Sequence, residues 1–90
     1  MSRAYAVAGE IVCDVCDRGV GLKSAAFKHS GDLLAAGYAV ACLALRYMTV
    51  LEELCVATAL DKGIARGPKL RQLHVALADH LFGRGITVGG

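Results

Sequence analysis

The sequence predicts an all-α fold, a compact bundle of about four main helices around a central apolar helix over residues 32–48. The charges of residues 3–18 gather on one side if the stretch is a helix, and they would not separate on a strand. Residues 33–45 carry no charge, but such a run is shorter than a membrane span and typical of a core helix. At 90 residues, we expect a single helical domain over 1–90.

The first helix is expected to begin near Ser2 and to end at Arg18. Serine is a good N-cap because its hydroxyl accepts a hydrogen bond from a backbone N–H of the first turn. Gly19 can adopt the left-handed conformation that closes a helix, and Val20 can then fold back over the end. Between the glycines that follow, the pattern is compatible with a further short helix over residues 22–29.

The second long helix is expected to begin at Asp32, which can cap it, and its apolar residues surround the whole helix. A helix that is apolar on every side belongs in the centre of a fold. Gly37 and Ala41 form part of a stripe of small residues, where a neighbouring backbone can approach closely. This stripe predicts helix packing rather than a ligand site.

The last two helices have clear start and stop signals. Thr49 and Glu52 have the spacing of a capping box, which predicts a third helix to about residue 60, closed by Gly63. Pro68 is well suited to the first position of a fourth helix because proline has no N–H to leave unsatisfied. We expect that helix to end at Gly83.

Composition indicates the kind of partner. Apolar residues make up 56% of the chain, which is more than one small core can bury, so apolar surface should remain for another subunit or protein. The net charge of +2 is too small to identify a nucleic-acid binder. We therefore expect a regulatory or inhibitory module that binds a protein partner and self-associates, without a small-molecule substrate or a membrane.

The sequence provides no catalytic set, so we assign no catalytic residue, expect no enzyme activity and expect no cofactor. Glu52 and Glu53 are adjacent and point apart on a helix, which does not suit a carboxylate pair. His74 and His80 are six residues apart on one helix, too far around it to bind one ion together.

The C-x-x-C pair of Cys13 and Cys16 keeps a zinc or redox module as an alternative, with His29 at a zinc-finger distance. The zinc pattern is incomplete because no second histidine stands at positions 33–35. A redox pair would need its first cysteine at a helix N-terminus, whereas both lie near a C-terminal end. We expect no metal, and free thiols favour the cytoplasm.

Basic residues gather around the connection between the third and fourth helices. Lys62, Arg66, Lys69 and Arg71 are accompanied there by Asp61 alone among the acids, and they predict a binding site for an anion or an acidic partner. Nucleic-acid binding through this connection is the second alternative. The resemblance to a helix-turn-helix is weak because the turn is several residues too long and Pro68 opens the would-be recognition helix.

Overall fold

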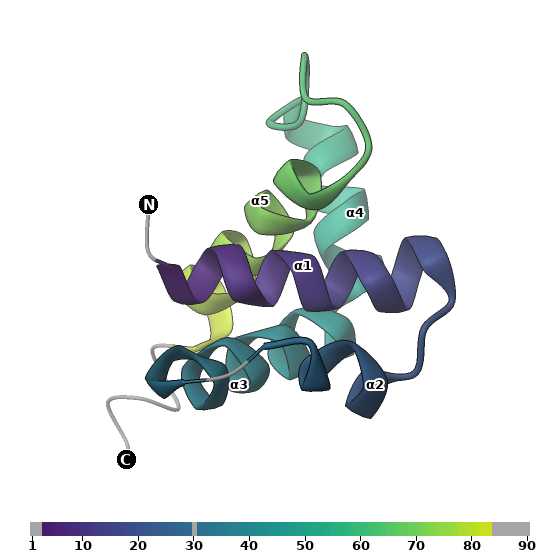
Figure 1. The fold of residues 1–90 in the computed structure, drawn as a ribbon. Helices are drawn as coiled ribbons and strands as arrows, with labels where there is room; N and C mark the ends of the chain where they lie inside the picture. Colours follow the sequence, from purple (N-terminus) through teal and green to yellow (C-terminus); the bar gives the residue numbers. More distant parts are fainter. Residues whose placement is uncertain (1–2, 30, 84–90) are drawn as a thin grey trace.

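The computed structural model describes residues 3–29 and 31–83, with the backbone alone for residues 32 and 33. It contains α1 (Arg3–Arg18), α2 (Leu22–Phe27), α3 (Asp32–Arg46), α4 (Met48–Thr58), α5 (Pro68–Ala78) and the π-helical turn η1 (Asp79–Gly83) (Figure 1). No strand occurs among these described residues, and the prediction of an all-α bundle is confirmed. The expected cap at Ser2 lies outside the described residues.

The centre of the bundle is α1 rather than α3, the helix that the sequence placed there. Figure 1 shows α1 crossing the molecule beside α3, and α1 also contacts α2 and α5. Ile11 and Val12 of α1 are fully buried, whereas Ala35 and Ala39 of α3 are exposed. The uncharged run in α3 misled the prediction because alanine resembles a core residue in a pattern but is readily tolerated at the surface.

Two glycines let the helices approach closely. A Cβ atom added to Gly37 of α3 would lie 2.7 Å from Cγ1 of Val7 in α1, so the predicted close approach at this position is confirmed. A Cβ added to Gly9 of α1 would lie 3.1 Å from the carbonyl oxygen of Pro68 in α5. The two sides of α1 are therefore packed against α3 and α5 at positions that need glycine.

The connection from α1 to α2 follows its sequence signals. Gly19 is left-handed, with φ at +70°, and the N–H of Val20 donates to the carbonyl oxygen of Asp14 at 2.9 Å. The buried Asp14 carboxylate accepts hydrogen bonds from Arg18 at 2.5 Å and from Lys28 at 2.9 Å. These bonds, led by the one from Lys28, lower the pKa of Asp14 and fasten α2 to α1.

The boundaries of α4 differ from the prediction. The helix begins at Met48, and its N-cap Tyr47 makes no side-chain capping bond, so Thr49 lies inside the helix rather than capping it. The Tyr47 ring stacks on Phe82 of η1 with centroids 4.1 Å apart, and this tertiary contact fixes the chain where α3 gives way to α4. The helix ends at Thr58 because Ala59 is left-handed, well before Gly63.

The last helix begins at Pro68 as predicted, but its α-helical part ends at Ala78. The chain continues to Gly83 as the wider turn η1, in which Asp79 accepts a hydrogen bond from the Tyr5 hydroxyl. This bond joins the far end of α5 to the beginning of α1, and a tertiary contact of this kind has no signal in local sequence.

None of the described helices alone combines the length and the apolar composition that a membrane span requires. Residues Leu34–Arg46 and α4 meet those criteria only as a pair, which is bent by 74°. Within α3, Ala41 and Ala44 are fully buried, so this helix contributes one of its faces to the core.

Candidate functional site

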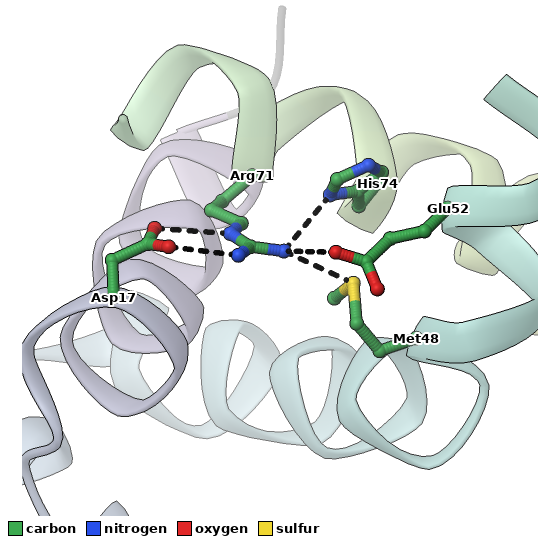
Figure 2. A network of polar contacts seen from close by, with 5 residues as sticks. All are labelled: Asp17, Met48, Glu52, Arg71 and His74. Carbon is green, nitrogen blue, oxygen red and sulfur yellow. Dashed lines mark hydrogen bonds and ion pairs between the residues drawn. The ribbon is translucent and has the colours of Figure 1, made fainter. Parts of the chain in front are cut away.

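The most elaborate polar contacts lie where α1, α4 and α5 meet. Figure 2 shows the five side chains that we name the Arg71 cluster: Asp17, Met48, Glu52, Arg71 and His74. Arg71 is only 5% exposed, and its Nε and Nη2 atoms donate to the two carboxylate oxygens of Asp17 at 3.1 and 2.8 Å. This two-bond geometry is the strong form of an arginine–carboxylate pair.

The remaining guanidinium nitrogen of Arg71 faces α4 and its own helix. Nη1 lies 3.2 Å from Sδ of Met48, 3.4 Å from Nδ1 of His74 and 3.5 Å from Oε2 of Glu52 (Figure 2). The side chain of Glu52 is 54% exposed, so water reaches the cluster from the α4 side. Arg71 therefore connects three helices through one buried charge.

The electrostatics of the cluster follow from these contacts. The hydrogen bonds from Arg71 hold the pKa of Asp17 at about 2, below the ordinary value of 3.8. Burial lowers the pKa of His74, and the positive charge of Arg71 lowers it further. Near neutral pH the cluster therefore holds ionised Asp17, charged Arg71 and a neutral imidazole.

The predicted cysteine pair borders this cluster. Cys13 is buried and Cys16 is exposed, and for both thiols burial is the main cause of a raised pKa. Cys13 also hydrogen-bonds to Asp17, which favours its protonated form. Thiols in this state are weak nucleophiles and poor metal ligands at neutral pH.

His29 follows α2 and is half-buried, and its backbone N–H donates to the carbonyl oxygen of Ala26. Across the described part of the chain, no group of three or more His, Cys, Asp or Glu residues is arranged to hold a metal ion. Cys13, Cys16 and His29 are therefore not brought together as a set of ligands in this structure.

The predicted anion site is divided by the fold. Lys62, Arg66 and Lys69 are exposed on the connection after α4 and on the first turn of α5. Arg71 lies two residues further, but its guanidinium turns inward to Asp17, a residue 54 positions away in the sequence. Proximity in the sequence grouped the four cations, whereas the pair with Asp17 could be found only in three dimensions.

A second surface is apolar, and the sequence predicted that such a surface should remain without locating it. Helix α4 buries Leu51 and Cys55 against the bundle, while Val56 is 80% exposed and Leu60, just after the helix, is 51% exposed. Glu52, Glu53, Val56 and Ala57 line a shallow hollow on this side of the helix. Figure 1 shows that α4 and the connection to α5 project away from α1 and α3.

Comparison of the chain with protein-family models, with curated proteins and with solved structures found no match. The molecule is thus defined by its own features as an all-α bundle with a projecting helical hairpin, formed by α4, residues 59–67 and α5. That hairpin carries both an apolar surface and the exposed basic residues.

Proposed function

We propose that the chain is a non-enzymatic regulatory or inhibitory module that binds another protein through the outward side of α4. The observation that carries the proposal is the 80% exposure of Val56 on a helix that is held to the bundle along one side only. Leaving such a side chain in water forgoes about 1.5–3 kcal/mol of burial free energy. A partner that covers this side of α4 would recover it.

The composition of α4 supports the same proposal. Val50 is 49% exposed, so apolar side chains open to water lie on more than one side of this helix. A helix with apolar residues on several sides is normally enclosed, whereas the main packing partners of α4 among the described elements are α5 and α3. Exposed apolar side chains with charged neighbours such as Glu52 are typical of a protein-binding surface.

The Arg71 cluster supports binding by keeping the hairpin in place. Its bond to Met48 and its ion pair with Glu52 tie the first turns of α4 to α5, and its pair with Asp17 ties α5 to α1. A binding helix fixed in advance loses less conformational entropy when a partner arrives. We therefore assign the cluster a positioning role.

Nucleic-acid binding remains the second candidate, favoured by the exposure of Lys62, Arg66 and Lys69 on one connection. Because Arg71 is already paired, three cations rather than four would face the phosphates. Such binding would weaken steeply with added salt, and replacing these three residues by alanine would abolish it.

The test is affinity capture from an extract of the native host, comparing the wild type with Val56→Asp and Phe27→Asp. Phe27 is 82% exposed on α2, so its replacement is a matched control for an apolar surface residue away from α4. We expect a protein that the wild type and Phe27→Asp retain and that Val56→Asp loses. Equal capture by all three, or capture abolished by nuclease, would contradict the proposal.

A further inference from the structure

His74 is a buried member of the Arg71 cluster, and histidine is the side chain that changes its charge near physiological pH. It belongs to α5 and is only 2% exposed. Nδ1 of His74 lies 3.4 Å from Nη1 of Arg71 (Figure 2). Arginine can only donate hydrogen bonds, so Nδ1 must accept, and the ring carries its single proton on Nε2. The fold therefore holds His74 as a neutral imidazole.

A second proton on this ring has no acceptor in the folded cluster. It would set the N–H of Nδ1 against the N–H groups of Nη1, with two positive charges side by side in a buried place. The charged side chains that act on the ring are Arg71 on its own helix, Glu52 on α4, Asp17 on α1 and Asp61 after α4. Burial, followed by the charge of Arg71, opposes protonation more strongly than the carboxylates favour it, and the net effect lowers the pKa of His74.

Protonation of His74 acts on one side of the Arg71 guanidinium. Nη1, the atom beside His74, is also the atom that contacts Met48 and Glu52 of α4. Nε and Nη2, on the other side, hold Asp17 of α1 (Figure 2). The pKa of Asp17 is about 2, so this pair stays ionised throughout the pH range in which histidine titrates. Mild acid therefore acts on the link from α5 to α4 and spares the link from α5 to α1.

We infer that His74 is a pH-sensitive switch, in which a proton on Nδ1 displaces the Arg71 guanidinium and releases α4 from α5 while α5 stays paired with α1. Helix α4 is suited to such release because it buries only Leu51 and Cys55. The consequence for binding rests on the proposed function. A partner that docks on the outward side of α4 should bind more weakly in mild acid, because the helix is then no longer fixed in advance.

The chain's own thiols measure the release. Cys55 of α4 is fully buried, Cys13 of α1 is 2% exposed and Cys16 of α1 is exposed. Methyl methanethiosulfonate labels the wild type at about pH 7 and about pH 5.5, and mass spectrometry of peptides gives the rate for each thiol. Well below the thiol pKa values, the thiolate fractions of Cys55 and Cys16 change with pH by the same factor. The ratio of the Cys55 rate to the Cys16 rate therefore reports the opening of α4.

This ratio should rise in the wild type by up to about tenfold from the higher pH to the lower one. The reason is that a released His74 binds its proton near pH 6.5 whereas the folded ring resists it, so acid favours the open form. His74→Gln keeps a neutral acceptor and cannot become charged, so its ratio should change by less than about twofold. His80→Gln is the matched control, because His80 is exposed on η1, and it should respond as the wild type does.

Three results would overturn the inference. The first is a rise in Cys55 labelling that persists in His74→Gln. The second is labelling of Cys13 as fast as that of Cys55, because the whole bundle would then open rather than α4 alone. The third comes from proton NMR of the wild type, which applies even if His74→Gln does not fold. The His74 ring should still be mainly neutral at pH 6.5, where a free imidazole is half protonated, and half-protonation there would exclude the switch.

The labelling experiment needs no partner, so its outcome is separate from that of the proposed function. If Cys55 labelling responds to acid as expected but Val56→Asp captures the same proteins as the wild type, the switch stands and the proposed function fails. If Val56→Asp loses a captured protein but acid leaves the labelling ratio unchanged, the proposed function stands and the switch fails.

Discussion

At the scale of single residues, the Arg71 cluster shows how a charge can be kept inside a small bundle. Arg71 is 5% exposed, and each of its three guanidine nitrogens has a polar or sulfur neighbour. Removing one member of a buried ion pair is costly because the other charge is left without compensation. The pair is therefore a sensitive point in the fold, and acid should act on it directly.

Asp17→Asn tests this pair and its dependence on pH. The unfolded carboxyl binds its proton near pH 3.8 and the folded one only near pH 2, so acid favours unfolding and the stabilisation is lost as pH falls between these values. Solvent reaches this cluster past Glu52, so we expect the variant to lower the free energy of unfolding by about 1–2 kcal/mol near pH 7. The deficit should shrink to a few tenths of a kcal/mol near pH 2, as measured by urea denaturation.

Glu53→Gln is the control for this experiment, because Glu53 is exposed and has no ion pair among the described residues. The free energy of unfolding of Glu53→Gln should follow that of the wild type at every pH. A deficit for Asp17→Asn that stays constant down to pH 2 would show that the pair with Arg71 is not what titrates.

Residue patterns in the sequence predicted which side chains are buried better than they predicted which side chains pair with each other. The burial of Ile11 and Val12 followed from helical periodicity, which is a local property. The inward turn of Arg71 depended on Asp17, which lies 54 positions away, and sequence neighbours gave no indication of it. The sequence therefore grouped Arg71 with the exposed cations, whereas the structure pairs it with Asp17.

At the scale of helices, packing is controlled by where backbones can approach. The Cβ that alanine would add at Gly37 lies closest to Cγ1 of Val7, at 2.7 Å, and also meets the carbonyl oxygen of Ala4 at 3.3 Å. At Gly9 the added Cβ lies 2.5 Å from Cγ of Gln72 and 3.1 Å from the carbonyl oxygen of Pro68. A side chain can be shortened by substitution, whereas a backbone atom can move only with its helix. The two glycines should therefore differ in whether shortening Val7 relieves part of the strain, because Val7 touches the Cβ added at Gly37 but is not among the nearest atoms to the one added at Gly9.

Gly37→Ala should lower the free energy of unfolding by about 1–2 kcal/mol, because the clash with Val7 outweighs the better helix propensity of alanine. In a Val7→Ala background the cost should fall by up to about 1 kcal/mol, because Cγ1 of Val7 is gone while its Cβ would still lie 3.0 Å from the added atom. Thermal or urea denaturation of the four proteins in this double-mutant cycle gives the coupling energy.

Gly9→Ala is the comparison for that cycle. Its cost should persist in the Val7→Ala background, because its steric conflict is with Pro68 and Gln72. If Val7→Ala relieved both glycine variants equally, a general loosening of the bundle, rather than a specific contact at Gly37, would be the explanation.

Some helix boundaries are set by local conformation and were predicted, whereas others are set by tertiary contacts and were not. Gly19 ended α1 where predicted because a left-handed residue is a property of the local chain. The predicted start of α4 at Thr49 was wrong because the helix already begins at Met48, without a side-chain capping bond. Stacking of Tyr47 on Phe82 positions this part of the chain instead. The predicted end of α4 was wrong because Ala59 adopts the left-handed conformation, which a sequence indicates for glycine but not for alanine.

At the scale of the whole molecule, the helices differ in how firmly they are held. Helix α1 is enclosed by α2, α3 and α5, with Ala8, Ile11 and Val12 fully buried. Helix α4 buries only Leu51 and Cys55 and contacts α3 and α5. All-α architecture was predictable from periodicity, but this order of burial was not, because it depends on which faces meet.

Hydrogen exchange should reveal that order. Amides of α1 should exchange only through global unfolding, whereas those of α4 should exchange through a smaller opening, because fewer buried contacts must break. Mass spectrometry of peptides from α1 and α4 measures both rates. Equal protection of α1 and α4 would contradict the central place of α1.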